Sequence, residues 1–165
     1  MLVNVTDKDK PALEAILAQN GISSAKFSLI RTESIACVAL SSCPLALAEG
    51  QRYMPSLLTK IEGLLAKHKL TEQPISIRMT GCPNGCARPN MAEIGFIGKS
   101  LGRYNMHLGG GRTGLRLNQI YKENLDETAI LTELDGLFAR YATERQPGEP
   151  FGDYTHRTVK FGGAA

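Results

Sequence analysis

The sequence predicts a single α+β domain with a mixed sheet and packed helices. Three observations support this prediction. The chain has 165 residues, of which 42% are hydrophobic and 21% charged, which suits one globular domain with its own core. Helical and alternating apolar patterns both occur, in an order typical of an α+β domain. There is no internal repeat, low-complexity tract or apolar run of the roughly 18 residues that cross a membrane. We expect the domain to span residues 1–145 and residues 146–165 to form an irregular tail.

The first third of the chain contains several signals for helices and strands. Residues 9–11 place a proline where a helix begins, and Asn20-Gly21 is typical of a helix end. Residues 26–40 alternate in a way that predicts one or two strands around residues 31–34. Cys43-Pro44 then predicts the start of another helix.

Stronger patterns follow in the rest of the chain. Leucine and isoleucine recur at helical spacing over residues 57–65 and predict a helix that ends near His68. Residues 75–79 alternate as a strand, which runs into a tight loop at residues 81–86. A last helix is expected to begin at residues 124–127 with an Asn or Asp cap and to end before residues 146–150. Between the loop and this helix we expect three short strands, at residues 93–98, 104–108 and 115–121.

Positive charge is concentrated in one stretch of the chain. The net charge is +3, but residues 78–116 hold six basic residues, one acid and nine of the 17 glycines. Such a stretch suits contact with an anion, which could be nucleic acid, a nucleotide phosphate or the carboxylates of a large cofactor. A solvated basic face is the simpler alternative, and charge alone does not exclude it.

The four cysteines form two tight pairs. Cys37 and Cys43 are separated by five residues, Cys82 and Cys86 by three, and each pair follows an expected strand. The N-terminus shows no secretion signal, so we expect a cytoplasmic protein, in which cysteines more often bind metal or carry redox chemistry than form disulfides. The spacing favours an iron–sulfur cluster over structural zinc or a redox dithiol, which usually use Cys-x-x-Cys. Four buried core cysteines are the remaining alternative.

The two cysteine motifs resemble those of the sulfite and nitrite reductase family. The residues that carry this resemblance are Cys37–Leu45 and Thr80–Arg88. Three further segments, at residues 102–110, 121–124 and 151–153, resemble the C-terminal part of the assimilatory, NADPH-dependent sulfite reductases of that family. The resemblance covers nearly the whole chain.

The resemblance implies a fold like the 4Fe–4S domain of nitrite and sulfite reductases, and it implies two cofactors. Cys37, Cys43, Cys82 and Cys86 would hold a [4Fe–4S] cluster, and Cys86 would also ligate the iron of siroheme. Asn84 is expected to contact the cofactor pair, and Arg88 to bind a siroheme carboxylate or balance charge. No catalytic residue is expected within this chain, because the family's substrate-binding basic residues have no counterpart here.

The family also implies an activity and partners for a longer enzyme. That enzyme is an oxidoreductase of sulfur assimilation and cysteine biosynthesis, which reduces sulfite to sulfide with six electrons taken from a flavoprotein component. The resemblance does not decide between an NADPH-dependent flavoprotein and ferredoxin as donor. We expect this chain to be an inactive fragment that binds neither nucleic acid nor membrane. The alternatives are a siroheme nitrite reductase domain and a zinc-stabilised module that binds nucleic acid.

Two weaker signals favour ordinary structural roles. Residues 109–114 match the glycine spacing of a dinucleotide-binding loop, but a strand pattern follows where that loop needs a helix, so we expect a glycine turn. His107 lies on an expected strand, and its simplest interpretation is a hydrogen-bonded core histidine. His68 and His156 are expected at the surface.

Overall fold

The sheet of this protein is mixed, as the sequence predicted. The structure is a computed structural model and describes residues 4–22 and 27–161. The strands lie side by side in chain order. β1, β2 and β3 run parallel, and β3, β4 and β5 run antiparallel. Their bounds are β1 Ile35–Ala36, β2 Ile77–Thr80, β3 Ile94–Ser100, β4 Arg103–Leu108 and β5 Gln119–Leu125.

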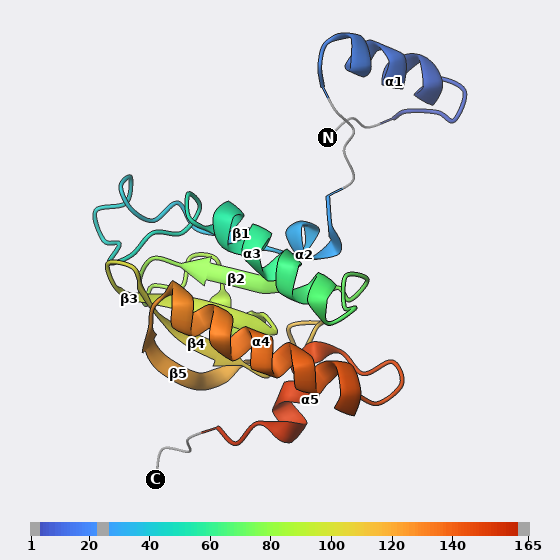
Figure 1. Ribbon diagram of the computed structural model, residues 1–165. Coiled ribbons are helices and arrows are strands. Elements are labelled where there is room, and N and C mark those ends of the chain that lie inside the picture. The colour runs from blue at the N-terminus through green and yellow to red at the C-terminus, as the bar shows by residue number, and fades with distance from the viewer. Residues whose placement is uncertain (1–3, 23–26, 162–165) are drawn as a thin grey trace.

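Two long helices cover one face of this sheet (Figure 1). They are α3, Met54–Lys67, and α4, Glu127–Glu144. Their apolar stripes pack on the buried side chains of alternate strand residues, such as Met79, Phe96 and Met106, which confirms the helical patterns predicted for both segments. Asp126 caps α4 by accepting a hydrogen bond from the Ala129 N–H at 2.9 Å, as the sequence indicated.

The remaining helices are short or lie outside the core. α1, Lys10–Gln19, forms where it was predicted, but none of its residues is buried, and it lies apart from the sheet (Figure 1). The 3-10 helix η1, Pro89–Met91, packs near β2 and β3. Two further helices, α2 (Leu29–Thr32) and α5 (Phe151–Thr158), were not predicted.

The prediction for residues 26–40 was wrong in part. Leu29–Thr32 forms α2 instead of a strand, and only Ile35–Ala36 pairs with the sheet; Lys26 lies outside the described residues. The reason is a tertiary contact, because Arg31 of α2 forms an ion pair with Glu62 of α3 at 2.8 Å. An alternating pattern cannot reveal that contact.

Cys43-Pro44 does not begin a helix, and α3 starts only at Met54. The backbone of this segment is used elsewhere, since the N–H groups of Leu47 and Ala48 both donate to the Gly81 carbonyl. The third of the expected strands is also shorter than predicted. β5 begins at Gln119, and Leu115 and Leu117 are exposed.

The segment 146–165 was expected to be irregular, but it contains α5. The rings of Phe151 and Tyr154 are buried and pack against Phe138 and Tyr141, with centroids 5.2–5.4 Å apart. This helix has only two large apolar side chains in eight residues, so its sequence shows no stripe. Residues 146–150 were predicted to end the last long helix. This is confirmed, because they form the turn between α4 and α5.

Candidate metal centre

The two cysteine loops leave the sheet at neighbouring strand ends. β1 and β2 are parallel, with Ala36 opposite Met79. Cys37 comes directly after β1, and its N–H donates to the Met79 carbonyl at 3.1 Å. Cys82 comes two residues after β2. Because parallel strands end at the same edge of a sheet, both loops begin side by side.

Gly81 is the point where the two loops touch. Its N–H donates to the Cys37 Sγ at 3.3 Å, and its carbonyl accepts from the Leu47 and Ala48 N–H groups at 2.8 and 3.0 Å. A Cβ at Gly81 would lie 2.6 Å from both the Ala39 Cβ and the Ala48 carbonyl oxygen. Only glycine therefore allows the segment 37–50 to pack this closely. This role of Gly81 was not predicted, although a glycine between a strand and a cysteine was a visible signal.

The four thiols are free and differ in exposure. Cys82 is buried, Cys37 and Cys43 are half-buried, and Cys86 is exposed. In the second loop the Arg88 N–H donates to the Gly85 carbonyl at 2.7 Å, and both of these residues have positive φ. The three predicted cofactor contacts, Asn84, Cys86 and Arg88, are exposed in this loop, as is Pro83.

The chemistry of the donor set fits an iron–sulfur cluster. Thiolates are the ligands that such clusters use, and the Gly81 N–H already donates to the Cys37 sulfur. Within residues 4–22 and 27–161, however, no three Cys, His, Asp or Glu side chains already form a metal-binding group. The structure thus brings the two loops together, and the convergence of all four thiols stays a prediction.

Most arginines of the basic stretch are used inside the chain. Arg103 pairs with Asp126 at 3.4 Å, and Arg116 pairs with Asp153 and donates to the Gly109 carbonyl. Arg112 lies 3.3 Å from a carboxylate oxygen of Glu33 and also donates to the Pro74 carbonyl. These three arginines therefore contact groups of this chain. Fewer cations of the basic stretch than expected remain to contact an anion.

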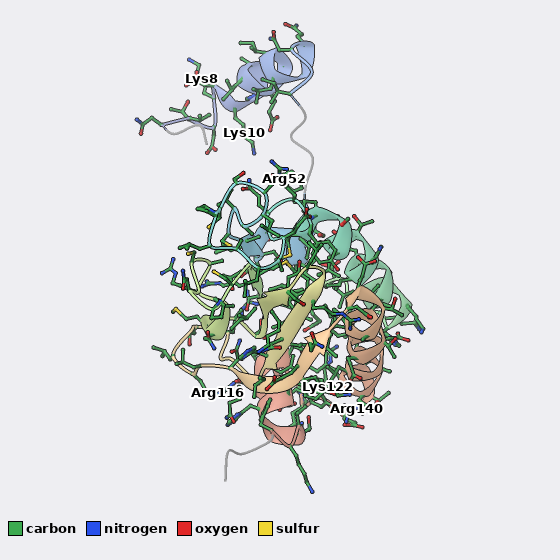
Figure 2. The ribbon with its side chains drawn as sticks, turned by 90° about the vertical axis from the view of Figure 1, so that its left-hand side faces the viewer. Lys8, Lys10, Arg52, Arg116, Lys122 and Arg140 are labelled. Atoms are coloured by element: carbon green, nitrogen blue, oxygen red, sulfur yellow. The ribbon has the colours of Figure 1, made fainter. Side chains whose placement is uncertain are left out.

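The six basic residues labelled in Figure 2 lie in separate parts of the molecule. Figure 2 shows Lys8 just before α1 and Lys10 at its start, Arg52 at the top of the body, and Arg116, Lys122 and Arg140 near its lower end. Lys122 is additionally paired with Glu133 at 2.5 Å. This distribution does not support a nucleic-acid surface, which needs clustered basic side chains.

Residues 109–114 form a glycine turn, as predicted, and not a dinucleotide-binding loop. Gly109 and Gly114 have positive φ, the Gly111 N–H donates to the Arg116 carbonyl, and β5 follows instead of a helix. A phosphate-binding helix N-terminus is absent at this place.

The histidines differ from expectation. His107 is not a satisfied core histidine, because its Nδ1 is buried without a hydrogen-bond partner among the described residues. Burial lowers the pKa of His107, and the charge of Glu123 opposes this effect. His68 is half-buried rather than at the surface, with its Nε2 2.6 Å from Asp135, whereas His156 is exposed as expected.

A sizeable hollow lies away from the cysteines. It has a volume of about 510 Å³ and is lined by Gln73 and Pro74, which precede β2, and by residues at the end of α4 and the start of α5. The cysteines lie at the other end of β2. Arg112, the cation that this hollow shares with the basic stretch, is already paired. The hollow therefore takes no part in the candidate site.

None of the helices in the described ranges has the length and apolar character needed to cross a membrane.

Comparison with known proteins confirms the resemblance seen in the cysteine motifs. The chain is 57% identical over 159 residues to the "Sulfite reductase [NADPH] hemoprotein beta-component" of Leptospira biflexa. It is 53% identical over 158 residues to the protein of that name from Nitrosomonas europaea. Each match covers 95% of this chain but only 29% and 28% of the relative. No family model matches the chain.

A solved structure shares the fold. The structure of the Mycobacterium tuberculosis NirA protein superposes with a TM-score of 0.74 at 24% identity, and the match covers 94% of this chain and 30% of that one. This likeness confirms the mixed sheet with packed helices. The chain therefore matches a piece of much longer proteins, less than a third of their length.

Proposed function

We propose that this chain, which matches part of the sulfite reductase hemoprotein beta-components, holds the [4Fe–4S] cluster of such an enzyme and contributes to its siroheme site. The observation that carries the proposal is the match at 57% identity over 95% of the chain, in which the two cysteine loops begin at adjacent strand ends. Cys37, Cys43, Cys82 and Cys86 would be the cluster ligands, and Cys86 would also reach the siroheme iron.

The environment of each loop supports these roles. The Gly81 N–H donates to the Cys37 sulfur, and the half-buried and buried thiols of the first three ligands suit a cluster shielded from water. Cys86 is exposed, as a ligand shared with a second group must be. Asn84 and Arg88, two residues before and after it, are exposed as well and would bind polar and carboxylate groups of the tetrapyrrole.

When bound, the cluster and the siroheme would store and transfer the electrons of a multi-electron reduction. The chain's own residues hold and orient these groups. Substrate binding would rest on basic residues in the part of the enzyme that this chain does not span, so we expect the chain alone to be inactive.

For the whole protein we propose sulfite as substrate, sulfide as product after six electrons, and a flavoprotein component as donor, in the cytoplasm. The names of the relatives favour sulfite and NADPH. They do not favour a nitrite reductase domain or a zinc-stabilised module that binds nucleic acid.

The test is anaerobic cluster reconstitution of this chain, followed by a visible spectrum and by iron, sulfide and zinc analysis. We expect about four irons per chain for the native sequence, as four thiolate ligands require. The Cys86→Ser variant should lose the cluster or hold it weakly. Ser42→Ala is the matched control, because Ser42 is an exposed polar residue next to Cys43 and carries no thiol.

Zinc without iron, or iron binding that is indifferent to Cys86, would contradict the ligand assignment. A longer protein that includes this chain should in addition show siroheme bands, and Cys86→Ser should remove them.

A further inference from the structure

The face of the sheet opposite the long helices carries a row of four residues from adjacent strands. Ile35 of β1 is opposite Arg78 of β2, Arg78 is opposite Gly95 of β3, and Gly95 is opposite His107 of β4. Residues paired across strands point to the same face of a sheet. Arg78 and His107 therefore lie on one face, but they do not adjoin, because the Pro89 carbonyl and the Asn118 side chain pack over Gly95 between them.

Arg78 is the least satisfied cation of the basic stretch. Its Nε and Nη1 atoms are buried and have no hydrogen-bond partner among the described residues. The residue as a whole is half-buried, and two buried nitrogens without an acceptor are costly, because they have lost water and gained no hydrogen bond. Arg103, Arg112 and Arg116 show the contrast, since each has an acidic partner inside the chain.

Two more polar groups on this face lack partners in the described part of the chain. Thr80 lies two residues after Arg78 on β2, so it points to the same face, and its Oγ1 is buried and unbonded. The Nδ1 of His107 is buried and unbonded as well. Three unpaired polar side chains on one side of a sheet are unusual, since buried polar atoms nearly always have a partner.

We propose that Arg78 is a carboxylate-binding residue whose partner comes from outside this chain. A carboxylate accepts two parallel hydrogen bonds from a guanidinium, and it neutralises the charge that burial penalises. Both Arg78 and Thr80 belong to the strand that leads into Cys82, which places this site beside the proposed cluster ligands.

Two sources carry this chemistry. One is a carboxylate of the tetrapyrrole, in which case the inference rests on the proposed function. The other is an Asp or Glu from the rest of the protein, since the chain spans only 29% of the length of its relative from Leptospira biflexa. The experiment separates them.

The first measurement uses the isolated chain and asks whether Arg78 has an internal role. Arg78→Met keeps the length of the side chain and removes the guanidinium. Because no described group bonds its buried Nε and Nη1, we expect the unfolding midpoint of Arg78→Met to equal or exceed that of the native chain. A lower midpoint would overturn the proposal, because it would reveal a partner inside the chain. Arg103→Met is the matched control and should lose stability slightly, since Arg103 is paired with Asp126 at the surface.

The second measurement uses a full-length protein that contains this chain. If the partner is a siroheme carboxylate, Arg78→Met should weaken siroheme retention by about 10- to 100-fold, while the iron and sulfide of the cluster stay at the native level. Arg78→Lys should restore part of the retention, because it returns the charge without the two-pronged geometry.

If the partner is a protein carboxylate, siroheme content should be unchanged, and the cofactor-free full-length protein should unfold at a lower temperature as Arg78→Met than as the native protein. If the proposed function is wrong, the native protein will hold no cluster. The unfolding temperature of the cofactor-free protein would then still show whether Arg78 has a protein carboxylate as its partner. Arg78→Met that matches the native full-length protein in both siroheme content and unfolding temperature would overturn the inference.

Discussion

Removal of the Glu93 carboxylate should be among the most damaging single changes in this fold. Glu93 is fully buried, just before β3, and connects three parts of the chain. Its Oε2 accepts from the Ser76 N–H at 2.9 Å and from the Ser76 Oγ at 3.2 Å, and its Oε1 accepts from the Gly152 N–H of α5 at 2.9 Å. Arg112 lies 4.0 Å from Oε2.

Glu93→Ala leaves two buried backbone N–H groups, those of Ser76 and Gly152, without their acceptor. At about 1–3 kcal/mol for each unsatisfied group, the free energy of unfolding should fall by about 2–6 kcal/mol. Urea unfolding followed by circular dichroism measures this change, because the chain has no tryptophan to report by fluorescence. Glu14→Ala, at an exposed position on α1, is the control and should change stability by less than about 0.5 kcal/mol.

The same carboxyl group makes a prediction about pH. Burial raises the pKa of Glu93 above its ordinary value of 4.5, and the hydrogen bonds from Ser76 and Gly152 and the charge of Arg112 oppose this only in part. A raised pKa in the folded state means that the folded protein binds this proton more tightly than the unfolded chain. The contribution of this proton is therefore complete below pH 4.5 and is lost as the pH rises through the raised value.

In a pH series, the stability advantage of the native chain over Glu93→Gln should shrink across this window, from pH 4.5 upwards. Two results would refute the reasoning. One is a Glu93→Ala protein within 0.5 kcal/mol of the native chain. The other is an advantage that grows as the pH rises from 4.5.

Two further changes test the loops and the last long helix. Gly81→Ala places a Cβ 2.6 Å from Ala39 and Ala48, so it should cost about 1–3 kcal/mol and lower the iron bound after reconstitution, whereas Ser42→Ala should do neither. Native iron content in Gly81→Ala would show that the loops need not pack at this point. Asp126→Ala removes the cap of α4 and should cost about 0.5–2 kcal/mol in urea unfolding; no loss would mean that the bond to the Ala129 N–H contributes nothing.

The sequence predicted the elements whose periodicity was long. The stripes of α3 and α4 and the alternation in β2 and β4 are confirmed, because each is repeated over several turns or residues against one core. The short elements could not be predicted in this way. α2 has four residues and depends on the contact of Arg31 with Glu62, and α5 depends on two rings that enter the core from a sequence rich in polar residues.

In the candidate site, too, local features could be predicted from the sequence and contacts between distant residues could not. The cysteine spacing and the strand before each pair are local features, and the strand ends lie side by side as those features indicated. The partners of the arginines are not local. Arg112 meets Glu33, and Arg116 meets Asp153, across 79 and 37 positions of sequence. Counting charge along the chain therefore overestimated the cations that remain for a ligand.

Some of the exposed apolar side chains and unpaired polar atoms of the described residues lie near the cysteines. Apolar side chains of the first loop, Val38, Leu45 and Leu47, are 46–65% exposed, and the unpaired Arg78 lies on the strand that leads to the second loop. At the other end of β2, Glu93 and its partners leave no comparable group. Exposed apolar surface costs free energy because it contacts water, and unpaired buried polar atoms cost free energy because they have lost water. A large, partly apolar group that carries carboxylates would remove both costs. A tetrapyrrole with acidic side chains has this combination of properties, and so has a protein surface that presents Asp or Glu among apolar residues. Loss of siroheme from Arg78→Met at an unchanged cluster content would therefore identify the tetrapyrrole as the group that covers this face.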